Sequence, residues 1–195
     1  MKKILTILSI LVIFTQTIFA NEQEMVKKQF LEKIEQVVSI VKNKTLTKEE
    51  RNSKIVTTLT PMFDFELMAK LSLGKKWKRL NKDDRKKFVK LYVERMKKSY
   101  SSKLDAYSDE KVEIKKIVQP KPNRMVLITD LVSSNDKLEI SYKFYKSKKI
   151  KPNKHRWLIY DVVIIGVSIL KADKAQFREY LQTHSISQLM DSFKN

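Results

Sequence analysis

Apolar residues recur at helical spacing through the first half of the chain. Between residues 22 and 43 they are three or four positions apart: Val26, Phe30, Ile34, Val37 and Val41. This spacing predicts an amphipathic helix. A second helix should begin after Thr47, where TKEE forms a capping box, and should end near Pro61. A short helix should follow Asp64, and Gly74 falls where the left-handed residue that ends a helix is expected.

The longest predicted helix runs from about Lys82 to Ala106, with Asn81 as its N-cap. One side of it is apolar: Phe88, Leu91, Tyr92, Met96, Tyr100 and Leu104. The other side is dense in Lys and Arg, so we expect the apolar side to be buried against a wide surface.

Beyond Tyr107 the apolar residues alternate with polar ones, which is typical of strands. Strands are expected around Val112, from Met125 to Val132 and from Leu138 to Tyr145, the last two joined by a tight turn. The most apolar run, Trp157 to Leu170, predicts a strand buried on both faces that bends or bulges at Gly166. Two short helices should follow it.

This order of elements indicates an α+β fold, with helices packed on one face of a curved antiparallel sheet. We expect about four or five strands and about six or seven helices.

The first twenty residues have the pattern of a secretory signal peptide. Lys2 and Lys3 precede an apolar segment, which reaches Ala20 just before polar residues. An uncleaved anchor helix is the alternative, although an apolar segment of roughly 17 residues is short for one. We expect residues 1–20 to be removed and residues 21–195 to form one domain in a bacterial periplasm. The chain has no Cys, which excludes disulfides and a lipoprotein anchor.

The chain is strongly basic, with a formal net charge of +19. Such a charge is common in proteins that bind nucleic acid. Export argues against nucleic acid and favours anionic lipid surfaces or acidic protein partners.

Residues suited to catalysis are few. The two histidines, His155 and His184, are far apart in sequence, and without Cys a transition-metal site is not expected. Two glycines in the whole chain are too few for phosphate-binding loops or dinucleotide fingerprints. Asp161 interrupts the apolar run and is either a general base or, the favoured interpretation, a hydrogen-bonded carboxylate that fixes strand register.

Two motifs carry a family resemblance. The first starts with FDFELMAKLSLGKKWKRL at Phe63 and continues through the long helix, with these matching residues: Phe63, Asp64, Phe65, Ala69, Leu73, Gly74, Trp77, Phe88, Tyr100, Leu104 and Tyr107. The second is WLIYDVVIIGVSILKADKAQF, which matches at Trp157, Tyr160, Asp161, Gly166, Val167, Ser168 and Phe177. In this order and separation the motifs closely resemble the MlaC, or toluene-tolerance, family.

The resemblance implies a phospholipid carrier of the periplasm that is not an enzyme. Members of that family move glycerophospholipid between an outer-membrane lipoprotein complex and an inner-membrane ABC transporter complex with an MCE-domain subunit, and so maintain outer-membrane lipid asymmetry. The implied cargo is a phospholipid held between the sheet and the helices. No cofactor, metal or nucleic acid is implied, and we expect a monomer.

On this interpretation the cavity wall comes from both layers. The helices would contribute Phe65, Met68, Leu71, Phe88, Tyr92 and Met96. The sheet would contribute Leu127, Ile140, Tyr142, Tyr160, Val162 and Ile164. Each of these could instead be ordinary core.

Five lysines are candidates for contact with lipid headgroups or an acidic docking partner: Lys75, Lys76, Lys148, Lys149 and Lys151. A solvated surface is the alternative for them. Two other functions remain open for the chain: an exported partner-binding or chaperone-like module with a filled core, and a small enzyme with Asp161 in its pocket.

Overall fold

The computed structural model describes the backbone of residues 2–104, 111–134, 136–148 and 155–194. It describes the side chains of the same residues apart from 2–20 and 100–104. Among the residues whose side chains are described, no helix is long and apolar enough to cross a membrane.

Helices occupy the first half of the chain and its C-terminal end, with the sheet between them. The first group comprises α1 (Lys2–Lys42), α2 (Lys48–Leu59), η1 (Thr60–Met62), α3 (Phe65–Leu73), η2 (Gly74–Arg79) and α4 (Lys82–Leu104). The strands are β1 (Lys111–Lys121), β2 (Arg124–Val132), β3 (Lys137–Lys146), β4 (Trp157–Ile164) and β5 (Val167–Ser168). The chain ends with α5 (Ile169–Tyr180) and α6 (Ile186–Ser192).

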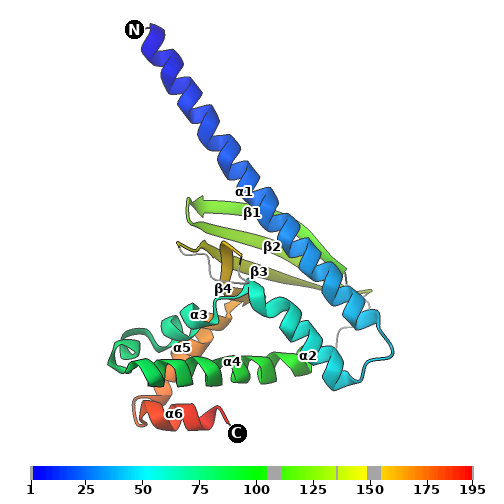
Figure 1. Ribbon diagram of the computed structural model, residues 1–195, viewed down its shortest axis with the longest axis vertical. Helices are drawn as coiled ribbons and strands as arrows, with labels where there is room; N and C mark the ends of the chain where they lie inside the picture. The colour runs from blue at the N-terminus through cyan, green and yellow to red at the C-terminus, as the bar shows by residue number, and fades with distance from the viewer. Residues whose placement is uncertain (1, 105–110, 135, 149–154, 195) are drawn as a thin grey trace.

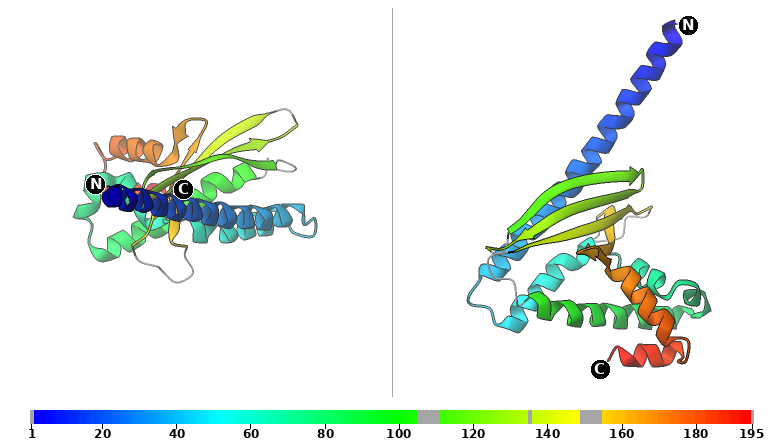
Figure 2. Two further views of the ribbon diagram at one scale, coloured as in Figure 1. Left: turned by 90° about the horizontal axis from the view of Figure 1, so that it is seen from above. Right: turned by 180° about the vertical axis from the view of Figure 1, so that it is seen from behind.

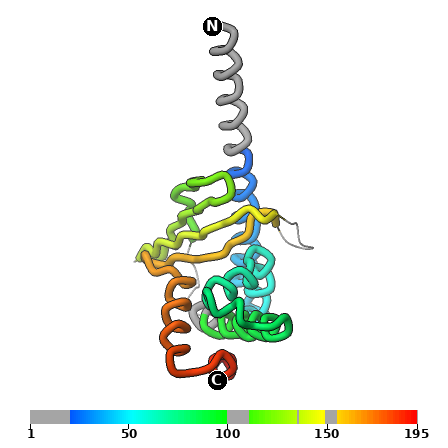
Figure 3. The backbone as a smooth tube through the Cα atoms, turned by 90° about the vertical axis from the view of Figure 1, so that its left-hand side faces the viewer, coloured from blue at the N-terminus to red at the C-terminus, as the bar shows by residue number. Residues whose placement is uncertain are grey.

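The five strands form one antiparallel sheet in chain order, β1-β2-β3-β4-β5. Figures 1 and 2 show the long α1 lying alongside the sheet and the helices α3, α4, α5 and α6 gathered below it. Figure 3 shows the same division from the side. The α+β fold predicted from the order of elements is confirmed.

The helix ends follow the local sequence signals. Thr47 and Glu50 form the expected capping box at the start of α2. The Asp64 side chain accepts a hydrogen bond from the Leu67 N–H and caps α3. Gly74 ends α3 with a φ of +57°, which confirms the need for a residue without a Cβ. Asn81 accepts hydrogen bonds from two N–H groups in the first turn of α4.

The prediction of one strand from Trp157 to Leu170 is wrong in its second half. Strand β4 ends at Ile164, and Ile165 and Gly166 make a two-residue turn before β5. The α5 helix then begins at Ile169. The apolar pattern failed here because Ile165 and Val167 are 72% and 63% exposed, so their hydrophobicity does not report burial.

The buried apolar residues form two clusters. The sheet cluster joins α1, η1 and one face of the sheet: Val26, Phe30, Met62, Met125, Leu127, Phe144, Trp157, Ile159 and Val162. The helical cluster joins α3, η2, α4, α5 and α6, with Met68, Leu73, Trp77, Phe88, Leu91, Tyr92, Met96, Phe177, Leu181, Leu189 and Phe193 among its members. Half-buried Phe63 and Ile169 pack against both clusters.

Candidate functional site

One face of the sheet, here called the inner face, packs against α1. Val26 and Phe30 from α1 are both 2% exposed and belong to the sheet cluster. The Phe30 ring lies 4.8 Å from that of Tyr142 on β3, measured between ring centroids. Because side chains alternate along a strand, the neighbours of these inward residues point to the opposite, outer face.

Burial is uneven along the inner face. Leu127, Phe144 and Trp157 are at most 2% exposed. Ile140 and Ile164, which lie opposite each other on β3 and β4, are only half buried, although both pack against the sheet cluster. The layer between α1 and the sheet is therefore tightly closed in one region and incompletely covered in another.

An open pocket of about 550 Å³ adjoins this layer at the C-terminal half of α1. It is lined by Ile34, Glu35, Val38, Ser39, Lys42 and Asn43. Ile34 also packs against the sheet cluster, which places the pocket next to the inner face. All six lining residues belong to α1 or directly follow it, and the pocket is largely open to solvent, so it is a shallow groove beside the inner face. Apolar and charged groups share its lining, as an amphiphilic ligand would require.

The helical cluster, in contrast, is filled. Met68, Phe88 and Tyr92 have no exposed surface. The Phe88 ring is in contact with four other aromatic rings of this cluster: Trp77, Tyr92, Phe177 and Phe193. Such packing of buried aromatic rings is typical of a stabilising core.

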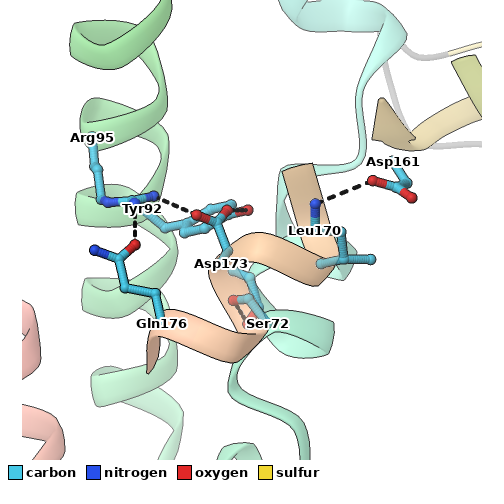
Figure 4. A network of polar contacts seen from close by, with 8 residues as sticks. Ser72, Tyr92, Arg95, Asp161, Leu170, Asp173 and Gln176 are labelled. Atoms are coloured by element: carbon cyan, nitrogen blue, oxygen red, sulfur yellow. Dashed lines mark hydrogen bonds and ion pairs between the residues drawn. The ribbon is translucent and has the colours of Figure 1, made fainter. Parts of the chain in front are cut away.

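Two buried carboxylates anchor α5, one to α4 and the other to the end of β4 (Figure 4). Asp173 accepts hydrogen bonds from the Tyr92 hydroxyl at 2.7 Å and from Arg95 at 2.8 Å, and so holds α5 against α4. Asp161 on β4 accepts hydrogen bonds from the Ser168 hydroxyl, the Leu170 N–H and the Lys143 ammonium group. This arrangement confirms the structural interpretation of Asp161, because its oxygens are already occupied by donors at the β4–α5 junction.

Comparison with known proteins decides the family. The family model described as MlaC protein matches residues 31–195. The chain belongs to the MlaC family. Over 114 residues it is 28% identical to the Intermembrane phospholipid transport system binding protein MlaC of Haemophilus influenzae, an alignment that covers 58% of the chain and 52% of that relative. The aligned region therefore spans only about half the length of the relative.

A solved structure supports the fold of this MlaC family member. A phospholipid-binding protein from Ralstonia solanacearum, determined in complex with a phospholipid, matches with a TM-score of 0.72 at 17% identity. The match covers 88% of the chain and 94% of the solved chain. At this identity the similarity establishes the shared fold.

In this MlaC family member the sequence-predicted wall residues separate into groups. Five from the sheet share the inner face: Leu127, Ile140, Tyr142, Val162 and Ile164. The helix residues Met68, Phe88, Tyr92 and Met96 lie in the helical cluster, with Phe65 at its edge. Leu71 is 36% exposed. Tyr160 lies at a register shift in β4, and its ring contacts Tyr145, whose side chain is on the outer face.

Three of the five predicted lysines lie in the described residues. Lys75 and Lys148 are exposed, whereas the Lys76 ammonium group donates a hydrogen bond to the Leu181 carbonyl at 2.6 Å. Lys149 and Lys151 lie outside the described residues.

Sequence reasoning did not assign the pocket residues of α1 to the site. The helical period marked Ile34 and Val38 as buried-side positions, but a period does not tell which neighbouring surface a helix covers.

Proposed function

We propose that this protein is a phospholipid carrier that holds acyl chains between the inner face of the sheet and the C-terminal half of α1. The observation that carries the proposal is the half-buried apolar surface around Ile140 and Ile164, next to the pocket at Ile34 and Val38. A folded protein normally buries such a surface, because each apolar Å² left in water costs about 25 cal/mol.

The proposed wall differs from the one expected from sequence. We keep the inner-face residues Leu127, Ile140, Tyr142, Val162 and Ile164 and add Ile34 and Val38 of α1. The helix residues of the filled cluster support the wall from below. We do not assign Phe65 or Tyr160 to the cavity wall.

The energetic reason for a carrier is the insolubility of acyl chains. Transfer of one CH₂ from water into an apolar environment is worth about 0.8 kcal/mol, so two chains with roughly 28 methylenes cost on the order of 20 kcal/mol to expose. A cavity that shields the acyl chains from water brings the free energy of extraction from a bilayer close to zero. No covalent step or cofactor is needed, and we propose that the protein is not an enzyme.

We further propose that the carrier works in the periplasm, between an inner-membrane ABC transporter complex with an MCE-domain subunit and an outer-membrane lipoprotein complex. The family assignment supports this role, as does the N-terminal segment with the pattern of a signal peptide. In this setting the chain would contribute to outer-membrane lipid asymmetry.

Native mass spectrometry of the protein purified without detergent, followed by lipid extraction, tests the proposal. We expect about one phospholipid per protein. Val38→Trp should lower the loaded fraction because its larger ring enters the pocket, whereas Val118→Trp on the outer face, where the side chain is 40% exposed, should not. An empty wild-type protein, or equal loading of the two variants, would contradict the proposed wall. An empty protein would favour the partner-binding module with a filled core.

A further inference from the structure

The turn between β4 and β5 has an unusual residue at its first position. Ile165 and Gly166 have φ values of +46° and +76°, and Ile164 pairs with Val167 across the turn. Two central residues with positive φ define the type I′ hairpin, which favours Asn or Asp followed by Gly. A β-branched residue at positive φ is a genuine outlier, because its Cβ is crowded against its own backbone.

Core packing does not explain this Ile. Its side chain is 72% exposed, and Val167 beside it is 63% exposed. These are the two most exposed large apolar residues in the described part of the chain. Strain of this kind persists only where the surrounding structure enforces it, and it gathers at functional sites. The tip therefore presents two aliphatic side chains to solvent at a cost to the fold.

Three basic residues follow the tip along α5, which also carries the buried Asp173 and the exposed Glu179. The α5 helix begins two residues after Val167, and Lys171, Lys174 and Arg178 are all exposed on it. Their spacing of three and four residues places them along one side of the helix.

The carboxylates close to the tip in the fold are already paired. Asp161 pairs with Lys143, and Asp173 pairs with Arg95. Glu139, whose backbone carbonyl accepts the Ile165 N–H, and Asp130 on the neighbouring strand share Lys115 as their partner. The basic stripe on α5 thus adds to the positive charge of the chain, +19 in total.

We propose that the Ile165–Val167 tip and the basic stripe of α5 together form a contact site for the surface of an anionic phospholipid bilayer. The aliphatic side chains would enter the headgroup region, and the cations would attract the acidic lipids, a combination typical of interfacial binding. Two aliphatic residues and three cations give weak, salt-sensitive binding, which allows rapid release. This inference goes beyond the proposed carrier function, because it assigns a direct bilayer contact that cargo binding does not require.

Cosedimentation with vesicles tests the site. The exported protein is mixed with vesicles of equal parts phosphatidylethanolamine and phosphatidylglycerol, and with vesicles of phosphatidylcholine alone. We expect binding to the anionic vesicles that falls with added salt, and little binding to the others. Ile165→Asn should weaken binding about tenfold, since one aliphatic side chain no longer leaves water.

The same variant separates this role from a structural one. Asn is favoured at the position of Ile165, so Ile165→Asn should raise the melting temperature while it lowers vesicle binding. Val118→Asn, at an exposed aliphatic position on β1, is the matched control and should leave binding unchanged. Lys171→Glu combined with Lys174→Glu should abolish the preference for anionic vesicles.

Three results would overturn the inference: wild-type protein that ignores anionic vesicles, equal binding to both vesicle types, or Ile165→Asn that binds as wild type does. Native mass spectrometry of Ile165→Asn should show normal lipid loading. If Ile165→Asn loses vesicle binding but keeps its lipid, the defect is in bilayer contact and not in cargo binding. If wild-type protein carries no lipid, the carrier proposal fails separately from the bilayer contact.

Discussion

The contacts of Asp161 allow a quantitative prediction about the β4–α5 junction. Its side chain is 4% exposed. Ser168 donates to both carboxylate oxygens at 2.9 and 2.8 Å, and the Leu170 N–H donates to Oδ1 at 3.1 Å. The Lys143 ammonium group donates to Oδ2 at 2.9 Å. Ser168 in turn caps α5 by accepting the Lys171 N–H. One carboxylate thus joins two strands to the start of a helix.

Replacement of Asp161 by Asn should destabilise the protein by about 2 to 3 kcal/mol. The amide retains one oxygen for Ser168 and the Leu170 N–H, but its NH₂ group then faces the Lys143 ammonium group, donor against donor. Hydrogen bonds to charged groups are worth about 1.5 to 3 kcal/mol. The Lys143 side chain is 29% exposed and can reach water, so the larger cost of a stranded buried charge does not apply.

Urea unfolding at neutral pH, followed by circular dichroism, measures this loss. A double-mutant cycle with Lys143→Met isolates the ion pair, and we expect a coupling energy between about 0.5 and 3 kcal/mol. Glu139→Gln is the matched control. The Glu139 side chain is 54% exposed and pairs with Lys115, so this substitution should lower the free energy of unfolding by less than about 1 kcal/mol. A loss for Asp161→Asn no larger than that of the control, with no coupling to Lys143, would refute this account of the junction.

Two further predictions concern Tyr145 and Gly74. Burial and the hydrogen bond that the Tyr145 hydroxyl donates to Asp64 raise the pKa of Tyr145 from 10.0 to about 12. The folded state therefore holds this proton more tightly than the unfolded state does. The contribution of Tyr145 to the free energy of unfolding is fully present below pH 10 and is lost as the pH rises through about 12. In urea titrations at alkaline pH, the free energy of unfolding should fall more steeply with pH for wild type than for Tyr145→Phe. Gly74→Ala should cost about 1 to 3 kcal/mol in urea unfolding through backbone strain alone, since the added Cβ would meet only the Lys174 side chain, at 3.6 Å; an unchanged midpoint would contradict this.

Local signals in the sequence were sufficient for several helix ends and for two strands. The capping box at Thr47, the cap at Asp64 and the glycine at residue 74 depend on a few neighbouring residues, and each is confirmed. Alternating polarity likewise located β2 and β3. These features are local, so they can be predicted without knowing what each element packs against.

The candidate site depends on long-range packing, which a pattern of polarity does not encode. The apolar side of α4 could have faced either the sheet or other helices, and Phe88 and Tyr92 in fact pack within the helical cluster. The bend predicted at Gly166 is confirmed by its place in the turn. The end of β4 at Ile164 was missed because the exposed Ile165 and Val167 are as apolar as buried residues. Hydrophobicity indicates that a surface needs cover, but not what covers it.

The separation of the two clusters bears on the proposed carrier function. The helical cluster is closed by its own aromatic rings and does not need a ligand to fill it. The layer between α1 and the sheet has incompletely covered apolar surface, which is where the proposed carrier would hold its cargo. Phe63 and Ile169 contact both clusters, and Asp161 fixes the chain next to Ile169. The helices are also joined to the sheet by the hydrogen bond from the Asp64 N–H to the Ile159 carbonyl and by that from Tyr145 to Asp64. A helical base anchored in this way can hold the fold together while the proposed cargo layer above it is loaded or empty.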